Sequence, residues 1–446
     1  MADEGTAITN EVIDLLQHLI RNECVNDGAL GSGHENRNVD TLAQYLGETG
    51  LETELYEPQP GRESLLTKIE GSDPEAPTLL LMGHTDVVPV NPSGWSRDPF
   101  GADVDDGFVW GRGAVDMLNL TASMAVAFRR LARSGFKPRG TLAYLAVADE
   151  EALGTWGAKW LTEHEPDAIV ADYVLTESGG FQIPSPNGPR LPVMVEEKGT
   201  YWSQLTVRGT PGHASQPFRT DNALVTAAEV VRRLADYRPP ARLSETWRTY
   251  VERMHFPPEL SKGLLDPGGF DEFLETLPVG LARLAHSCTH TTFAPTVAHG
   301  GTKTNIIPDS VELQVDIRTL PGQTSEETRA MLLDAIGDLI DHVEIESNDD
   351  PSTESPRDTA LWDVLGRASG RLCEGSALVP FIMTGGTDNR FFRRAGSVGY
   401  GFGLFSRRLR FEDYAAMFHG NDERVDQESL RLSTELWLAV AEDLLT

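Results

Sequence analysis

Three short apolar stretches in the first half of the chain end in polar residues that a buried strand does not need. They read TLLLMGHTD (78–86), GTLAYLAVADEE (140–151) and DYVLTESGG (172–180). Segments with helical periodicity, such as 7–22 and 120–136, alternate with strands of this kind. This alternation predicts an α/β fold, in which ligands bind at the carboxyl ends of the strands. We therefore expect the polar strand ends to contribute to one site.

From about residue 196 the pattern becomes that of a different kind of unit. TYWSQLTVRG (200–209) and TNIIPDSVELQVDIRTL (304–320) alternate apolar and polar residues, as half-exposed strands do, with helical patterns between and after them. The polar run SNDDPSTESPRD (347–358) then has the composition of a linker. Because 446 residues exceed one ordinary core, we predict an α+β unit inserted into an α/β unit, with segments 1–195, 196–350 and 351–446.

The charge of the chain restricts its partners. Its 38 lysine and arginine residues stand against 68 aspartate and glutamate residues, which gives a formal net charge of −30. Such a chain repels nucleic acid and anionic membranes, so neither is an expected partner. No uncharged apolar stretch reaches the length of a membrane helix, and the acidic, amphipathic first residues resemble no secretory signal. Three widely spaced cysteines suggest reduced thiols, so we expect a cytoplasmic location.

His84 and Asp86 lie two positions apart at the end of the first apolar stretch. Residues i and i+2 of an extended strand point to the same side, so these two side chains share a face. An aspartate beside a histidine can accept one ring N–H and leave the other ring nitrogen free to bind a metal. An ordinary hydrogen-bonded pair at a strand end has the same sequence, so this pair does not decide the question alone.

Other polar residues occupy comparable positions. Each has an ordinary explanation, because acidic pairs are usually solvated and an aspartate before a helix is usually a cap. Together with His84 they form a set of nitrogen and oxygen donors of the kind that suits zinc. The set comprises Asp116 in GRGAVDM, Glu150 and Glu151, Glu177, and His419 in FHGNDER.

The motifs, read in order, resemble those of a known family. The chain contains, in sequence, GHTDVVPV, GWSRDPF, GRGAVDM, ADEE, TES, GTPGHAS, GTKTNIIPD, DIR, GGTDNRFF and HGNDER. In order and spacing, and over nearly its whole length, it resembles the di-zinc family of aminoacylase, succinyl-diaminopimelate desuccinylase and glutamate carboxypeptidase. The resemblance implies a zinc-peptidase-like α/β catalytic domain with a central mixed sheet flanked by helices, and an inserted α+β dimerisation (lid) domain. It also implies two Zn²⁺ ions per subunit, although the same ligands would permit Co²⁺ or Mn²⁺.

The resemblance further assigns roles position by position. Asp116 would bridge the two ions, Glu151 and Glu177 would bind opposite ions, and Asp86 would orient His84 from behind. Glu150 would be the general base. The metal ligands that the resemblance implies are His84, Asp116, Glu151, Glu177 and His419.

Elementary chemistry supports this division of roles. Adjacent residues of an extended chain point in opposite directions, so Glu150 and Glu151 would not serve one metal together. Two Zn²⁺ ions carry four positive charges against the three negative charges of the carboxylate ligands. The surplus favours a bound hydroxide, because zinc lowers the pKa of water towards about 7. Glu150 could then take a proton from the water and deliver it to the leaving amine.

His213, in GTPGHAS, belongs to the inserted unit rather than to the strand ends. In the family that the chain resembles, this histidine reaches the active site of the partner subunit and stabilises the tetrahedral oxyanion, and the insert forms the dimer. A loop histidine with only local contacts would have the same sequence. The resemblance thus predicts a homodimer formed through the inserted unit.

Several residues resemble substrate-binding positions of the family. Asn305 and Arg318 would hold the carbonyl and the carboxylate of the substrate, although Arg318 could equally form a surface ion pair with Asp316. Gly386 and Thr387 resemble a loop whose free backbone amides bind the substrate carboxylate. Arg390, in the same stretch, could assist.

Two segments have no assigned role. We expect HSCTHT (286–291) to be a strand of the insert. His286, Cys288 and His290 would then share one face, as the ligands of a further metal site would, but the family that the chain resembles has no ligands there. Segment 251–285 looks longer than the equivalent connection in compact members, and it could be a lid, a dimer contact or decoration.

We therefore expect a zinc-dependent hydrolase that cleaves an amide bond next to a carboxylate-bearing residue, as an N-acyl amino acid deacylase does. A dipeptidase or carboxypeptidase acting on short peptides would need the same metal centre. A non-catalytic relative that binds peptides is a third reading, and Glu150 argues against it because a binding protein needs no acid or base beside a ligand.

Overall fold

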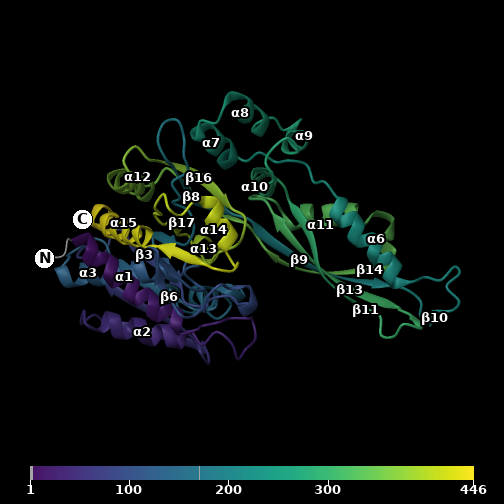
Figure 1. Cartoon of the computed structure of the whole chain (residues 1–446), viewed down its shortest axis with the longest axis horizontal. Helices are drawn as coiled ribbons and strands as arrows, with labels where there is room; N and C mark the ends of the chain where they lie inside the picture. Colours follow the sequence, from purple (N-terminus) through teal and green to yellow (C-terminus); the bar gives the residue numbers. More distant parts are fainter. Residues whose placement is uncertain (1–3, 170) are drawn as a thin grey trace. The chain divides into compact units, whose positions relative to one another are not determined.

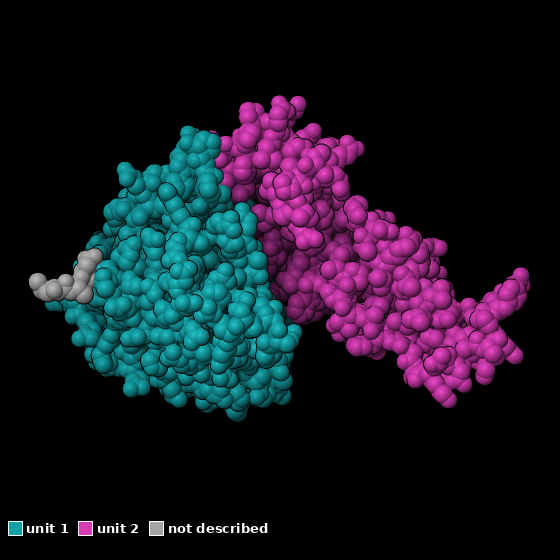
Figure 2. Space-filling model, in the orientation of Figure 1, with its two compact units in different colours: residues 1–195, 355–381, 387–446 teal, residues 196–354, 382–386 magenta. Residues whose placement is uncertain are grey.

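The computed structural model, which describes residues 4–169 and 171–446, is built around two large sheets, to which two small ones are added (Figure 1). The chain divides into two compact units, coloured separately in Figure 2. The first unit comprises residues 1–195, 355–381 and 387–446, and the second comprises 196–354 and 382–386. The second unit therefore continues beyond residue 350, where the sequence placed its end, and includes a short segment near residue 384.

The larger sheet is mixed, as predicted, and lies in the first unit except for its residues 196–197, 353–354 and 382–383. Its strand order is β1-β2-β6-β3-β7-β17-β8-β15, and β16 pairs with β8. Its centre consists of β6, β3 and β7, in which β3 runs parallel to both neighbours. The strands are β1 (Thr53–Gln59), β2 (Arg62–Ile69), β3 (Leu79–His84), β6 (Leu142–Val147), β7 (Tyr173–Thr176), β8 (Arg190–Glu197), β15 (Thr353–Glu354), β16 (Ala377–Met383) and β17 (Val398–Gly401).

Helices cover both faces of this sheet because its central strands are apolar on both sides. Along β3, Leu79 and Leu81 belong to one buried cluster, whereas Leu80 and Met82 belong to another. The first cluster is covered by α1 (Glu4–Arg21), α2 (Asn36–Gly47), α3 (Leu118–Ser134), α12 (Ala360–Leu372) and α15 (Gln427–Leu445). The second is covered by α4 (Ala158–His164), α5 (Pro166–Ile169) and α13 (Asn389–Arg394).

Smaller elements complete the first unit. The three-stranded sheet β18-β5-β4 joins residues that are far apart in the sequence. These elements are β4 (Val104–Asp105), β5 (Phe108–Trp110), β18 (Arg424–Asp426), α14 (Phe411–Met417) and the short 3₁₀ helices at Pro92–Gly94 and Glu150–Ala152.

The second unit has an antiparallel sheet of order β11-β13-β9-β14. Apolar residues alternate along β9 and β13, and helices α6 and α11 pack on the apolar face. A two-stranded ribbon pairs β10 with β12. The strands are β9 (Gly199–Arg208), β10 (Gly212–His213), β11 (Thr292–Gly300), β12 (Ile306–Ile307), β13 (Ser310–Thr319) and β14 (Val343–Asp350). The helices are α6 (Ala223–Asp236), α7 (Glu245–Met254), α8 (Pro258–Leu264), α9 (Phe270–Leu274), α10 (Val279–Thr289), α11 (Ser325–Ile336) and a 3₁₀ turn at Gly337–His342.

The expected strand at 286–291 is wrong. His286 and Cys288 lie in α10, and β11 begins only at Thr292. The buried residues Ala285, Cys288 and Thr289 follow the three- and four-residue spacing of a helix face, on which positions i and i+2 do not coincide. Segment 251–285, which has no assigned role, forms most of a group of short helices in the second unit.

None of the helices within the described residues combines the length and the apolar character of a membrane-spanning segment. Cys24, Cys288 and Cys373 are all buried and carry free thiols.

Candidate metal centre

The polar residues at the ends of β3, β6 and β7 meet at one edge of the sheet. His84 is the last residue of β3 and pairs in register with Val147, the last residue of β6. Glu177 directly follows β7, the other neighbour of β3. Because the three strands are parallel, their carboxyl ends converge, as the sequence pattern indicates.

Two groups of metal-binding side chains share Asp116. The first contains His84, Asp116 and Glu177, and the second contains Asp116, Glu151 and His419. In each group the ligand atoms lie within 4.8 Å of one another. Within the described residues these are the groups of three or more that could hold a metal ion, and segment 286–291 belongs to neither.

Asp116 occupies the centre of both groups. Its Oδ1 lies 3.2 Å from Nε2 of His84, and its Oδ2 lies 3.1 Å from Nε2 of His419. Asp116 precedes α3, but no side chain caps the first turn of that helix. The ordinary explanation of this aspartate as a helix cap is therefore wrong, and both of its oxygens face histidines.

The carboxylates of the centre are crowded in a buried space. Burial, reinforced by the charge of Asp116, raises the pKa of Glu151 to about 8. Burial and the charges of Glu150 and Asp116 raise the pKa of Glu177 well above its ordinary value. Burial also raises the pKa of Asp116, but hydrogen bonds from the two histidines outweigh this effect and lower it to about 2.

These residues fit a pair of divalent cations. Oε1 of Glu151 is buried and has no hydrogen-bond partner among the described residues, while its Oε2 lies 3.3 Å from Nε2 of His419. Ionised carboxylates repel one another at this density, and cations between them would remove that repulsion. Histidine nitrogens and carboxylate oxygens are donors that suit zinc and related ions.

Asp86 lies beside His84 and contacts more than this one residue. Nδ1 of His84 lies 3.0 Å from the backbone carbonyl oxygen of Asp86 and 3.4 Å from its Oδ1. The same carboxylate accepts the backbone N–H groups of Glu150, at 3.3 Å, and of Glu151, at 3.0 Å. Asp86 thus fixes the end of β3 relative to the segment that follows β6.

A buried polar network that the sequence analysis missed supports Asp86. Asn26 donates to Oδ2 of Asp86 at 2.8 Å and accepts a hydrogen bond from Arg62 at 2.9 Å. Arg62 pairs with Glu35 at 2.6 Å, and Glu35 accepts the backbone N–H of Asp149. No sequence motif marks Asn26, Glu35 or Arg62, and only the fold brings them together.

Glu150 and Glu151 differ in their surroundings, although the reason predicted from an extended chain is wrong. Both residues lie in a 3₁₀ turn that begins after Asp149, whose φ is 68°. Within this turn Glu151 joins the second ligand group, whereas Glu150 belongs to neither. Burial raises the pKa of Glu150 to about 7.

The stretch 387–390 lies against this turn. Arg390 is buried and donates hydrogen bonds to the carbonyl oxygens of Leu153 and Thr387. Asp388, also buried, has no hydrogen-bond partner for either carboxylate oxygen among the described residues. Burial, with the charge of Glu150, raises the pKa of Asp388 well above its ordinary value.

The remaining predicted residues lie mostly in the second unit. His213 is exposed on β10, and its Nδ1 lies 2.7 Å from Oγ of Ser215. Asn305 is also exposed, and its backbone carbonyl oxygen accepts the backbone N–H of Ala214. Arg318 forms two hydrogen bonds with Asp316, at 2.8 and 3.1 Å, so the ion pair considered in the sequence analysis is present. Gly386 ends the second unit's short segment, and Thr387 begins the last segment of the first unit.

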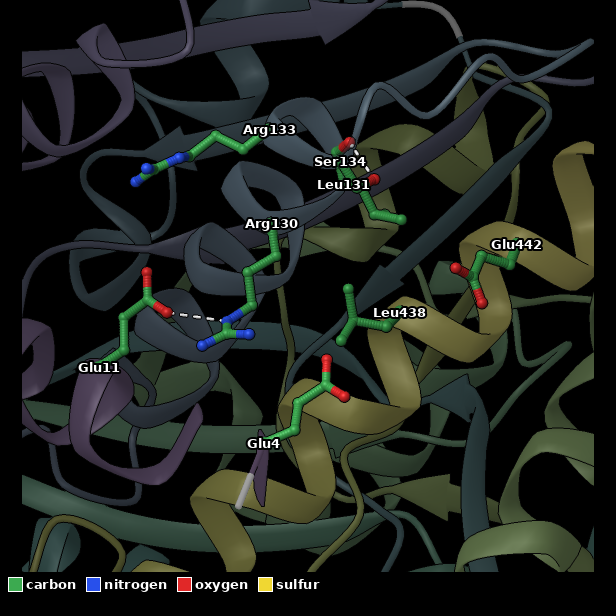
Figure 3. A pocket seen from close by; sticks show the side chains of 8 residues that line it. All are labelled: Glu4, Glu11, Arg130, Leu131, Arg133, Ser134, Leu438 and Glu442. Atoms are coloured by element: carbon green, nitrogen blue, oxygen red, sulfur yellow. Dashed lines mark hydrogen bonds and ion pairs between the residues drawn. The ribbon is translucent and has the colours of Figure 1, made fainter. Parts of the chain in front are cut away.

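A cavity of about 590 Å³ lies elsewhere, between α1, α3 and α15 (Figure 3). Its lining includes Leu131 and Leu438, and Arg130 donates from Nε to Glu11 at 2.8 Å. It contains none of the predicted site residues, so the candidate site is the cluster at the strand ends.

The sequence of the chain matches the profile of Peptidase family M20/M25/M40 over residues 80–443. It is 30% identical to the human N-fatty-acyl-amino acid synthase/hydrolase PM20D1 over 379 residues, which cover 82% of this chain and 74% of that protein. It is 28% identical to human aminoacylase-1 over 387 residues, which cover 85% of this chain and 83% of that protein.

Solved structures agree with the fold. An M20 family metallo-carboxypeptidase, Sso-CP2, from Sulfolobus solfataricus superposes with a TM-score of 0.74 at 18% identity, covering 99% of both chains. Human carnosine dipeptidase 1 gives a TM-score of 0.71 at 15% identity, covering 99% of this chain and 98% of that one. At these identities the similarity supports the fold alone.

Proposed function

The chain belongs to Peptidase family M20/M25/M40, and we propose that it is a di-zinc amidohydrolase that removes the acyl group from N-acyl amino acids. One observation carries this proposal. Two groups of candidate ligands share Asp116, and Glu150, which precedes Glu151 in the same turn, belongs to neither. A site with two cations and a free carboxylate is equipped to hydrolyse an amide bond.

The ligands divide between two ions. His84 and Glu177 would hold one ion, Glu151 and His419 would hold the other, and Asp116 would bridge them. When bound, the ions supply Lewis acidity and lower the pKa of water. Zinc suits this donor set, and Co²⁺ or Mn²⁺ could replace it.

Glu150 would move the proton. One of its Oε atoms takes a proton from the attacking water and returns it to the amide nitrogen as the C–N bond breaks, so that an amine leaves. The carboxylate of Asp86 accepts the backbone N–H of Glu150, and this hydrogen bond would hold the backbone of the base in place beside the end of β3. The products are a carboxylate and an amino acid.

The second unit would contribute to binding and assembly. We propose that His213 stabilises the oxyanion in the site of a partner subunit, and that Asn305 and Arg318 hold the carbonyl and carboxylate of the substrate. Gly386 and Thr387 would present backbone amides to the same carboxylate. Arg318 would have to exchange its contact with Asp316 for the substrate or share the guanidinium between them.

The relatives favour an acylated amino acid as the substrate. The names of aminoacylase-1 and of the N-fatty-acyl-amino acid synthase/hydrolase PM20D1 both refer to such substrates. Carboxypeptidase and dipeptidase activities are the alternatives, because a metallo-carboxypeptidase and a dipeptidase share the fold.

The test is a substrate screen with metal-reconstituted enzyme. Acetyl and long-chain acyl derivatives of several amino acids are compared with dipeptides and with C-terminally blocked peptides. Higher kcat/KM for the acylated amino acids supports the proposal. Cleavage of dipeptides alone would replace it with a peptidase function, and peptide binding without turnover would make the chain a binding protein.

The division of roles between neighbouring glutamates gives the first prediction. Glu150→Gln should retain both metals and lower kcat by several orders of magnitude, because only proton transfer is lost. Glu151→Gln should instead weaken metal binding. Metal analysis by mass spectrometry, together with kcat, separates the two, and a metal-depleted Glu150→Gln beside a metal-replete Glu151→Gln would reverse the assignment.

A further inference from the structure

Glu423 is a buried carboxylate that contacts the segment bearing Asp116 without belonging to either ligand group. Its Oε1 accepts the backbone N–H groups of Val115 at 2.6 Å and Asp116 at 3.1 Å. Its Oε2 accepts the backbone N–H of Gly113 at 3.1 Å and a hydrogen bond from NH1 of Arg112 at 2.9 Å. Both oxygens are therefore occupied by donors from one short segment.

Strand pairing explains why this carboxylate meets that segment. Arg424, at the start of β18, pairs with Trp110, at the end of β5. The next residue after β5, Gly111, donates its N–H to the carbonyl oxygen of Glu423 at 2.9 Å. The chain from 111 to 116 then curls around the Glu423 side chain. The pairing of β18 with β5 brings two candidate ligands together. His419 precedes Glu423 by four residues, and Asp116 ends the curled segment.

The curled segment needs a glycine where it approaches its neighbours. Gly113 has a φ of 88°, and a Cβ there would lie 2.5 Å from Leu118 and 2.9 Å from Val87. Glycine adopts this conformation without steric cost. The segment is thus shaped to place successive N–H groups around one anion, an arrangement that binds a negative charge strongly.

We propose that Glu423, held by Arg112, is the positioning residue for the bridging ligand Asp116. Asp116 donates its own N–H to Glu423, so the carboxylate fixes the backbone of the one residue that both ligand groups share. Removing that anchor would let Asp116 move away from His84 and His419. This inference rests on the proposed metal centre and assigns to it a residue that does not bind metal itself.

The competing explanation is that Glu423 only stabilises the fold of segment 111–116 and has no influence on metal binding. It predicts lower thermal stability and unchanged metal affinity in the folded protein. Positioning predicts weaker binding, because loss of partners that orient ligands costs about 10–100-fold in metal affinity. The two explanations therefore differ in a quantity other than activity.

The test compares Glu423→Gln with the wild-type protein and with Glu11→Gln. In Glu423→Gln one acceptor becomes an NH₂ group facing backbone N–H donors. Glu11 is the control, because it accepts hydrogen bonds from Arg129, Arg130 and Tyr45 in the same unit but, among the described residues, has no hydrogen bond or ion pair with a segment that bears a candidate ligand. Metal-free protein is titrated with Co²⁺ against a chromophoric chelator, and the absorption spectrum of the bound cobalt is recorded.

Glu423→Gln should bind Co²⁺ about 10–100-fold more weakly, with an altered cobalt spectrum and a kcat that recovers at saturating metal. Glu11→Gln should lose stability and keep the affinity and spectrum of the wild type. Unchanged affinity and spectrum in folded Glu423→Gln would overturn the inference. If Glu423→Gln does not fold, Arg112→Lys, which retains the charge but not the planar fork, is judged by the same criteria. Failure of the wild type to bind two equivalents of Co²⁺ would instead refute the metal centre itself.

Discussion

At the residue scale, Asp86 shows how a side chain outside the ligand set can order a site. Its carboxylate contacts the imidazole of His84 and the backbone N–H groups of Glu150 and Glu151, while Asn26 holds it from the other side. A His-x-Asp pair therefore links two neighbouring strand ends. Hydrogen bonds to an ionised carboxylate are stronger than those between neutral groups, which suits this task.

Arg318 carries the prediction about substrate recognition. A chain of net charge −30 repels an anionic substrate at long range, but salt screens that repulsion beyond about 8 Å. A local guanidinium must then supply the attraction. Arg318→Ala should lower kcat/KM for a carboxylate-bearing substrate by about 10–100-fold, the loss expected for a charge-assisted hydrogen bond. The same substrate with an amidated carboxyl group should be affected far less.

Arg208 offers a matched control for this measurement. It forms a two-bonded ion pair with Glu344 on the same sheet, as Arg318 does with Asp316. Arg208→Ala should leave both substrates unaffected. If Arg318→Ala changes kcat/KM equally for the free and the amidated substrate, Arg318 does not bind the carboxylate and serves only in the ion pair with Asp316.

The sequence revealed some residues of the site and concealed others for a physical reason. His84 and Glu177 are conspicuous because polar side chains rarely end buried apolar strands. Arg62 and Glu35 lie in ordinary polar surroundings along the chain, and nothing in the sequence shows that the fold buries them as a pair. Glu423 stands within the recognisable HGNDER motif, but its hydrogen bonds depend on the pairing of β18 with β5.

At the scale of elements, periodicity predicted the two kinds of sheet and missed details that tertiary context decides. The expected strand 304–320 is interrupted at Pro308, which lacks an N–H donor, and divides into β12 and β13. The sequence did not predict helix α10, and its last residues were expected to form a strand because two histidines flanking a cysteine imitate strand alternation over a few residues. Short apolar segments are ambiguous in this way.

The end of α10 also contacts a buried lysine, Lys198, that no motif marks. Nζ of Lys198 donates to the carbonyl oxygens of Ser287 at 3.0 Å and His290 at 2.7 Å. Ser287 lies in the last turn of α10 and His290 directly follows the helix, at the end where the helix dipole favours a positive charge. Burial nevertheless lowers the pKa of Lys198 to about 7.

This shift predicts a pH dependence with a defined sign. Between pH 7 and about 10 the unfolded chain binds a proton on Lys198 that the folded chain has released, so this group makes the protein more stable as pH rises. Relative to Lys198→Met, the wild type should gain up to about 1.4 kcal/mol per pH unit in this range. Denaturant unfolding at pH 7, 8 and 9 measures the free energy of unfolding of both proteins. Subtracting one from the other removes the contributions of the titrating groups that the two proteins share. A difference independent of pH would contradict the prediction.

At the scale of the whole molecule, the second unit exposes apolar side chains in β12, in α6 and in the loop that follows β10. Phe218 is 81% exposed and Val225 66% exposed, and Ile306 pairs in register with His213 across the β10–β12 ribbon. The backbone N–H of Thr210 bonds to the carbonyl oxygen of Asp221, which joins the ribbon to the start of α6. Exposed apolar patches rimmed by polar residues are typical of protein interfaces. This surface supports the proposal that two copies associate through the second unit.

Subunit mixing tests whether association also completes the active site. If His213 acts in the partner's site, His213→Ala and Glu150→Gln are each inactive alone, because every site lacks one of the two groups. In a mixed dimer one site combines an intact Glu150 with an intact His213 from the partner, whereas the other site lacks both. Mixing under conditions that exchange subunits should therefore restore activity to about one quarter of the wild-type level, since half of the dimers are mixed and each has one complete site of two.

Introducing Val225→Glu into both chains should prevent association, seen by light scattering, and abolish the recovery, because burying a charge at an apolar contact is costly. Proven exchange without recovered activity would show that His213 does not act across subunits.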